Sequence, residues 1–179
     1  MRKTLLVLGI CCVMAAPAWA GGGFSLFGSY SEINDDGQAL GAGARVSIGG
    51  DKWVGDLSWT WFPSKDGVET IAGIEDTFQF IPTDFGVRYL FQTQSSFKPY
   101  VGGGGTFFYL NLNNGDVDNT WGVYGLLGFN LGEHRTKFFA EILYRWGDTD
   151  VTYFAVPNPI TGSMDVGGFA INAGLTWAF

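Results

Sequence analysis

Apolar and polar residues alternate with a period of two along most of the chain. The alternation is clearest at the C-terminus, where one face is apolar and carries Phe169, Ile171, Ala173, Leu175, Trp177 and Phe179. The opposite face has only small or polar residues: Gly168, Ala170, Asn172, Gly174, Thr176 and Ala178. A period of two is that of a β-strand, in which successive side chains point to opposite sides of the sheet.

Seven further segments repeat this alternation, so the sequence predicts an all-β fold of eight strands. The strands are expected near residues 23–31, 39–48, 53–62, 77–91, 97–112, 120–131, 137–147 and 167–179. The phase is irregular before Thr83, where Phe78 and Phe80 would point to the polar face. Pro82 cannot donate a ladder hydrogen bond, and it predicts a bulge that shifts the phase at this point.

The connections between the predicted strands alternate in length. Segments 49–52, 92–96 and 132–136 are short, whereas 32–38, 63–76, 113–119 and 148–166 are generally longer and more polar. Short turns at one end and long loops at the other are typical of an antiparallel up-and-down transmembrane barrel. Such a barrel turns its apolar face to lipid, whereas a soluble, lipocalin-like barrel would enclose that face.

Charged residues are sorted among these segments. The four long connections hold 12 acidic residues and one basic residue, Lys65. The short turns and the strand ends beside them are basic on balance, with Asp51 and Glu133 against Lys52, Lys98, Arg135 and Lys137. The remaining six charges all fall on predicted inward positions, and they are Arg45, Asp56, Asp84, Arg88, Glu141 and Arg145.

These six charges predict an interior network of ion pairs. An eight-stranded barrel is only wide enough for side chains, and an unpaired buried charge would cost several kcal/mol. The turn at 49–52 would place Arg45 opposite Asp56. Strand direction predicts two layers, a lower one near the short turns with Arg45, Asp56, Arg88 and Glu141, and an upper one with Asp84 and Arg145.

The second short turn, at 92–96, would place Arg88 opposite Tyr100. The network as a whole has two possible roles. It either closes the barrel and fixes the strand registers, or it forms a gate whose rearranged ion pairs open a narrow conductance.

The first 20 residues are predicted to be a cleaved signal peptide. Arg2 and Lys3 precede an apolar run from Leu5 to Val13 that is too short to cross a bilayer, and residues 18–20 fit the small-x-small cleavage rule. A retained membrane anchor is the alternative. The expected organisation is therefore a signal peptide over 1–20 and one barrel domain over 21–179.

Composition excludes several classes of partner and site. Both cysteines lie in the leader, so the barrel is expected to need neither disulfides nor thiols. Without the leader, eight basic side chains stand against 17 acidic ones, which makes the chain a poor nucleic-acid binder. No cofactor is expected.

Two segments resemble a known family of barrels. Residues 175–179, Leu-Thr-Trp-Ala-Phe, resemble the terminal signal read by the barrel assembly machinery, so Phe179 is the candidate assembly signal. Residues 98–105, Lys-Pro-Tyr-Val-Gly-Gly-Gly-Gly, resemble the opening of a middle strand in small barrels of the OmpA-type membrane-domain superfamily.

The resemblance implies an integral, porin-like protein of a Gram-negative outer membrane. It is expected to be a monomer in contact with outer-membrane lipids and lipopolysaccharide. No peptidoglycan-binding domain is expected after Phe179, so a role in tethering the membrane to the cell wall is not implied.

Enzymatic and metal-dependent functions find little support in the sequence. Lipid A deacylases and palmitoyl transferases with similar barrels need a histidine base, and the one histidine, His134, is predicted to be a solvated turn residue. Asp116 and Asp118 are weak metal candidates, because their loop lacks the spacing of a calcium-binding loop. The acidic loops could still attract divalent cations by charge alone.

The sequence therefore supports three functional hypotheses. The first is a structural or surface-interaction barrel with at most narrow, gated permeability. The second is passage of small or apolar solutes across the outer membrane. The third and most distant is a lipid-modifying enzyme.

Overall fold

The computed structural model describes residues 21–33, 37–63, 65–69, 75–112, 115–153 and 160–179. The strands within these ranges are β1 (Gly22–Ile33), β2 (Gly37–Gly49), β3 (Trp53–Trp61), β4 (Lys65–Glu69), β5 (Glu75–Leu90), β6 (Phe97–Leu112), β7 (Gly115–Val117), β8 (Thr120–Leu131), β9 (Thr136–Trp146), β10 (Asp148–Tyr153), β11 (Ile160–Asp165) and β12 (Gly168–Ala178). Among the described residues, no helix is long and apolar enough to cross a membrane. The predicted signal peptide, 1–20, lies outside the described residues.

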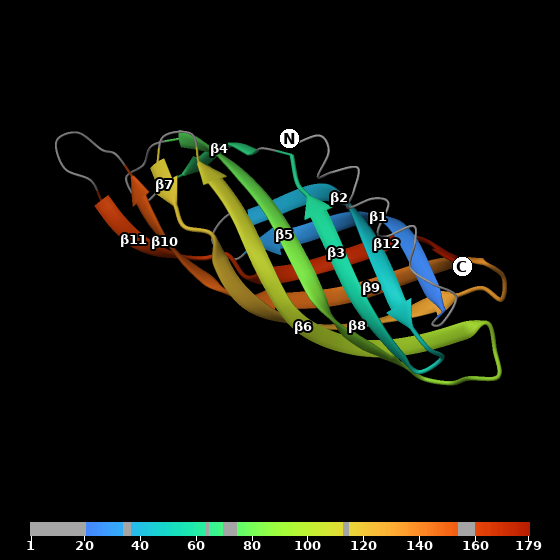
Figure 1. Ribbon diagram of the computed structural model, residues 1–179. Helices are drawn as coiled ribbons and strands as arrows, with labels where there is room; N and C mark the ends of the chain where they lie inside the picture. The colour runs from blue at the N-terminus through green and yellow to red at the C-terminus, as the bar shows by residue number, and fades with distance from the viewer. Residues whose placement is uncertain (1–20, 34–36, 64, 70–74, 113–114, 154–159) are drawn as a thin grey trace, which may run out of the picture.

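Eight of the described strands close an antiparallel, up-and-down barrel (Figure 1). Their order is β3-β2-β1-β12-β9-β8-β6-β5, and the pairing of β3 with β5 closes the sheet. The first and last strands are joined at their ends, because the Gly22 N–H donates to the Phe179 carbonyl (3.1 Å) and the Phe179 N–H to the Gly22 carbonyl (2.9 Å). Closure pairs the strand edges that an open sheet would expose.

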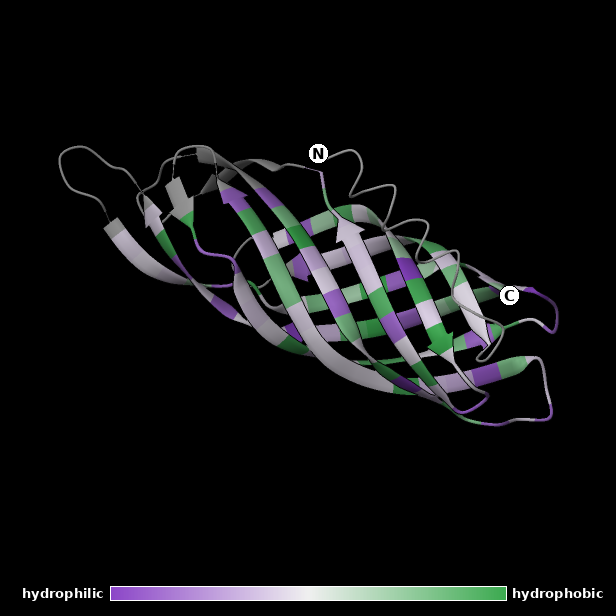
Figure 2. Cartoon of the chain, viewed as in Figure 1, coloured by the Kyte–Doolittle hydropathy of each residue, from purple (hydrophilic) through white to green (hydrophobic). Residues whose placement is uncertain are grey.

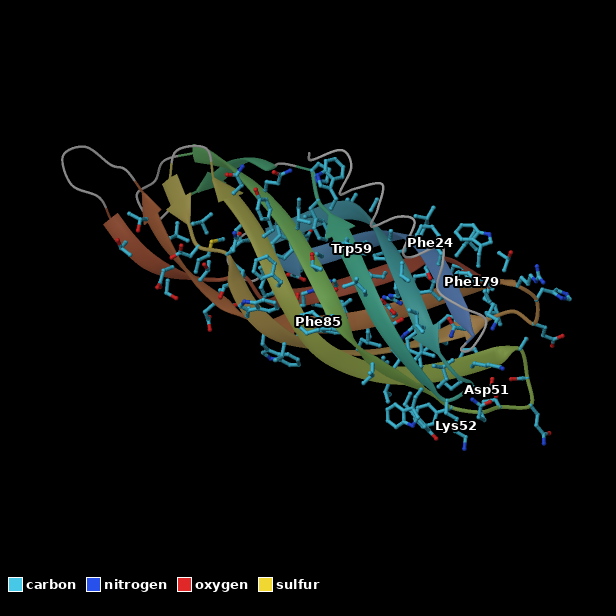
Figure 3. The ribbon with its side chains drawn as sticks, in the orientation of Figure 1. Phe24, Asp51, Lys52, Trp59, Phe85 and Phe179 are labelled. Atoms are coloured by element: carbon cyan, nitrogen blue, oxygen red, sulfur yellow. The ribbon has the colours of Figure 1, made fainter. Side chains whose placement is uncertain are left out.

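The barrel turns its large apolar side chains outward. Trp53 is 62% exposed and Leu127 is 56% exposed, and Figure 2 shows the two kinds of residue alternating along the strands. Phe24, Trp59 and Phe85, which are labelled in Figure 3, are further exposed members of this outward face. The predicted orientation is thus confirmed, and the lipocalin-like alternative is wrong. An apolar belt of this kind needs lipid around it, because water would solvate it poorly.

The two ends of the barrel differ, as the connection lengths predicted. The turns at 50–52, 91–96 and 132–135 lie together at one end, called here the turn end, with Asp51 and Lys52 (Figure 3). The other end, called the loop end, carries β4, β7, β10 and β11 (Figure 1). In barrels of the outer-membrane type the short turns face the periplasm, so that is the side expected for the turn end.

The long connections contain strands where the sequence predicted loops. β10 pairs with β11 from Asp148↔Asp165 to Tyr153↔Ile160, and β7 pairs with β10. β4 pairs with the first residues of β5. These segments lack the apolar alternation of a lipid-facing strand, because they extend the hairpins beyond the belt. Their strands form because the backbone of a neighbouring segment is available for hydrogen bonding, and the pattern of side chains does not predict this.

The bulge predicted at Pro82 is absent from the described ladder. β5 pairs with β6 without interruption from Phe78↔Leu112 to Leu90↔Tyr100. The even-numbered residues of β5, Pro82 among them, direct their backbone groups toward the side of β3. The Phe80 carbonyl, for example, accepts from the N–H of Phe62, the residue that follows β3 (3.4 Å). The continuous β3–β5 ladder ends at Thr83, so the missing N–H of Pro82 falls just outside that ladder.

The two predicted turn registers are wrong by two residues. Arg45 lies opposite Ser58 rather than Asp56, and Arg88 lies opposite Gly102 rather than Tyr100. The first turn spans residues 50–53 and is closed by the Gly50 N–H donating to the Trp53 carbonyl (2.9 Å). A shift of two keeps every side chain on its predicted face, whereas a shift of one would have reversed all of them.

A charge on the outward face should destabilise the barrel if that face lies in lipid. Leu127 is an outward residue midway along β8, and we expect Leu127→Arg to lower the free energy of unfolding in bilayers by about 2–4 kcal/mol. Urea unfolding in lipid vesicles measures this change. Thr161→Arg on β11 adds the same charge outside the belt and should have little effect, so equal losses in the two variants would contradict a lipid-facing position for Leu127.

Candidate functional site

The six predicted interior charges all lie inside the barrel. Strand parity turns their side chains inward, and all six are shielded from solvent. Arg45 comes from β2, Asp56 from β3, Asp84 and Arg88 from β5, and Glu141 and Arg145 from β9. The structure brings them together as three arginine–carboxylate pairs.

Arg45 and Glu141 form a two-pronged pair across the lumen. Arg45 Nη1 donates to Glu141 Oε2 (3.0 Å), and Nη2 donates to Oε1. Glu141 also accepts from the Tyr100 hydroxyl (2.8 Å) and from the Asn172 amide (2.9 Å). The Glu141 carboxylate is therefore the centre of four hydrogen bonds from three strands, which is what a buried charge needs to be tolerated.

Aromatic rings complete the surroundings of the Arg45 guanidinium. Its carbon lies 5.2 Å from the centre of the Phe139 ring and 5.6 Å from that of Phe27. A guanidinium over an aromatic face is attracted by the electron-rich face of the ring quadrupole. These rings fill the space beside the ion pair, so the pair and its neighbours pack as one layer.

Arg88 and Asp56 form the second pair, nearer the turn end. Arg88 donates to Asp56 through Nε and through Nη2, the latter at 2.8 Å from Oδ1. Ser47 bridges the two side chains, because it accepts from Arg88 Nη2 (3.2 Å) and donates to Asp56 Oδ1 (2.6 Å). The guanidinium also lies 4.7 Å from the centre of the Tyr100 ring. Tyr100 thus links this pair to Glu141.

Arg145 and Asp84 form the third pair, nearer the loop end. Arg145 Nε donates to Asp84 Oδ1 (2.9 Å) and Nη2 to Oδ2 (2.6 Å). Ser58 adds a hydrogen bond to the same carboxylate at 3.4 Å. The three pairs fall into the two layers expected from strand direction, with Arg145 and Asp84 in the upper layer. Within the lower layer Arg45 pairs with Glu141 and not with Asp56, which it was predicted to face.

An apolar cluster lies between the charged layers and the loop end. Its buried members come from barrel strands and from the segments beyond them, and they are Phe62, Phe80, Phe108, Leu110, Val151 and Val166. Phe80 stacks on Phe108 with ring centres 5.7 Å apart. The lumen therefore carries its charged side chains toward the turn end, with a second apolar cluster among them that includes Leu126 and Leu143, and it is apolar toward the loop end.

The lumen opens at the turn end into a cavity of about 240 Å³. All eight barrel strands contribute to its lining, with Arg88 and Ser47 at the inner side and Lys98, Asn130 and Lys137 on the walls. The cavity stops at the Arg88–Asp56 pair, so that pair separates it from the rest of the interior.

The two metal candidates do not form a site together in the described part of the chain. The side chain of Asp116 lies outside the described residues. Asp118 borders a shallow hollow with Asp148 and Asp150. No group of three metal-ligating acids, histidines or cysteines is close enough to hold an ion among the residues described.

His134 and Phe179 lie at the turn end. His134 is exposed in the turn between β8 and β9. Phe179 completes the pairing of the last strand with β1, and the residue is 66% exposed. Its role as an assembly signal stays a prediction.

Sequence reasoning missed several residues that complete the network. Ser47 and Asn172 donate hydrogen bonds directly to the carboxylates of Asp56 and Glu141. The sequence does not distinguish such residues from small polar residues that only fill space on the inward face. The apolar cluster was also missed. The inward parity of Phe80 was the available signal, and the supposed bulge at Pro82 obscured it.

Known proteins resemble this chain in three-dimensional structure and not in sequence. No family model matches the chain, and no curated protein matches it in sequence. The crystal structure of the outer membrane protein OprG from Pseudomonas aeruginosa is similar with a TM-score of 0.72 and 17% identity, covering 89% of this chain and 96% of that one.

Two further structures agree. The outer membrane protein AlkL, solved in lipid bilayers, has a TM-score of 0.61 and 16% identity over 89% of this chain and 90% of that chain. Outer Membrane Protein W of E. coli has a TM-score of 0.58 and 12% identity over 89% and 98%. At these identities the likeness is one of fold, and the chain is an eight-stranded antiparallel β-barrel of the outer-membrane type.

Proposed function

We propose that the protein is an integral barrel of the outer membrane with a structural or surface-interaction role and a lumen that is closed at rest. The observation that carries this proposal is the set of three arginine–carboxylate pairs inside the barrel. Two of them cross the interior, between β2 and β9 and between β5 and β9, and the third joins the neighbouring strands β3 and β5. They fill a lumen that is narrow in any eight-stranded barrel. Permeability, where it occurs, requires these pairs or the apolar cluster to rearrange.

The loop end supports the surface-interaction part of the proposal. Asp118, Asp148 and Asp150 are exposed there around one hollow, and no ion pair within the described residues neutralises them. Such a surface attracts cations. Divalent cations held between these carboxylates and the phosphates of lipopolysaccharide would join the protein to its surroundings.

Conductance of the folded barrel in planar bilayers tests closure. We expect the wild-type barrel, Arg88→Ala and Glu141→Ala all to stay silent, because Phe62, Phe80 and Phe108 still obstruct the loop end after an ion pair is broken. Combining Arg88→Ala with Phe108→Ala weakens both obstructions, the ion-pair layers and the apolar cluster, and should allow a small conductance.

The same measurement identifies the alternatives. If the single variant Arg88→Ala conducts and the turn variant Glu133→Ala does not, the ion pairs act as a gate. A conductance in the wild type would contradict a closed lumen. Each variant is first checked for folding by its circular dichroism in the same lipid.

Passage of small apolar solutes is the second candidate, and the apolar cluster favours it. Its side chains line the loop end and would accept an apolar molecule more readily than an ion. Faster uptake of an apolar solute by vesicles that contain the barrel, slowed when Phe108 is replaced by tryptophan, would favour this function over closure.

A lipid-modifying enzyme is the most distant candidate. A histidine-dependent mechanism would use His134 as its general base from the turn end, where it lies exposed beside Glu133 and Arg135. A mechanism that uses only carboxylates of the acidic loops is the alternative. Incubation of the folded barrel with lipid A, followed by mass spectrometry of the lipid, tests for acyl removal or transfer.

A further inference from the structure

The cavity at the turn end has basic side chains that point into it. Lys98 lies two residues before the buried Tyr100 on β6, and Lys137 lies two residues before the buried Phe139 on β9. Side chains two apart on a strand share a face, so both lysines face the lumen. Asn130 on β8 pairs directly with Lys98 and faces the same cavity.

Neither lysine is neutralised within the described part of the chain. Both are half-buried, and neither ammonium group has an ion pair or a side-chain hydrogen bond with the described residues. Two acidic groups share the cavity, the exposed side chain of Asp51 and the carboxylate of Phe179, and neither forms an ion pair with a lysine there.

Arg88 supplies a third cationic donor at the inner side of the cavity. Its side chain is directed to Asp56 and Ser47 through Nε and Nη2. No hydrogen bond to a described residue uses Nη1, although the residue is only 6% exposed. Nη1 is not among the buried side-chain atoms without a partner in the described part of the chain, so it keeps some exposed surface. Because Arg88 lines the cavity, this nitrogen can donate to a group bound there.

We propose that this cavity binds a small oxyanion of the phosphate type, held by Lys98, Lys137 and the Nη1 group of Arg88, with the Asn130 amide beside it. Ammonium and guanidinium groups converging from three strands suit an anion with several oxygens, because each oxygen can accept a charge-assisted hydrogen bond. The cavity faces the periplasmic side, so its anion is either a free phosphate or the phosphate of a lipid headgroup.

Titration of the folded barrel with inorganic phosphate tests the proposal. The full barrel is held in a polyoxyethylene detergent, which contains no phosphate, and the amide NMR signals of Gly23 and Asn130 are followed. We expect saturable shifts with a dissociation constant on the order of 1 mM at low ionic strength, weakening as salt is added. Absence of saturation would overturn the proposal.

Charge-matched variants distinguish a site from general attraction. Lys98→Gln and Lys137→Gln should each weaken phosphate binding by about fivefold to tenfold. Lys52→Gln removes the same charge from an exposed turn outside the cavity lining and should change the affinity less than about twofold. Equal weakening by all three would overturn the site in favour of nonspecific attraction.

A second arm identifies the source of the anion. In bilayers of phosphatidylglycerol without added phosphate, shifts at Asn130 that are lost in Lys98→Gln would assign the site to a lipid headgroup. If shifts appear only when inorganic phosphate is added, the site takes the free anion. Closure of the lumen is measured separately by conductance, so neither result depends on it.

Discussion

Replacing Glu141 with alanine is expected to lower the free energy of unfolding by about 3–5 kcal/mol. The substitution removes the acceptor of four hydrogen bonds and leaves the Arg45 guanidinium, which is 3% exposed, without its counter-charge. The cost is large because the nearby carboxylate, Asp56, is already paired with Arg88, and an unpaired charge inside a narrow barrel is poorly solvated. Urea unfolding in lipid vesicles, followed by tryptophan fluorescence, measures it.

The control variant is Glu133→Ala, which removes the same carboxylate from an exposed turn and should cost little. A double variant, Arg45→Met with Glu141→Met, tests whether the unpaired charge is the cause. It should recover much of the stability lost in Glu141→Ala, since buried ion pairs can often be replaced by apolar side chains of similar volume. Equal losses in Glu141→Ala and Glu133→Ala would mean that the pair does not brace the barrel.

Phe108→Ala is expected to cost a comparable amount, about 3–5 kcal/mol. Phe108 is fully buried and stacks on Phe80. Two glycines leave room for its ring, because a Cβ atom added at Gly122 would lie 2.8 Å from the ring and one at Gly147 would lie 2.6 Å from it. So close a fit leaves a cavity when the ring is removed.

Phe107→Ala is the matched control for this prediction. Phe107 precedes Phe108 on β6, faces outward and packs on Trp121 with ring centres 4.8 Å apart. Lipid chains can fill the space that its ring leaves, so its loss should cost less than half as much. The same urea unfolding measurement compares the two variants, and a larger loss in Phe107→Ala would show that the apolar cluster adds little stability.

The sequence by itself determined the eight barrel strands and the face of their residues, except before Thr83, where the predicted bulge at Pro82 is absent. Predicted bounds for β6 and β8 agree with the structure, and the other barrel strands differ by one or two residues at their ends. The inward placement of charges such as Arg88 and Glu141 also followed from the sequence. These features are local, because the alternation of side chains along a strand needs no knowledge of its partners.

Only the tertiary structure decided which groups meet. Arg45 pairs with Glu141, 96 positions away in the chain, and a shift of two residues in a turn changes every cross-strand neighbour without altering any face. The apolar cluster and the basic cavity likewise collect residues from strands that are distant in sequence. Register and closure depend on turn geometry and on backbone pairing around the whole barrel, and neither is encoded in the alternation of a single strand.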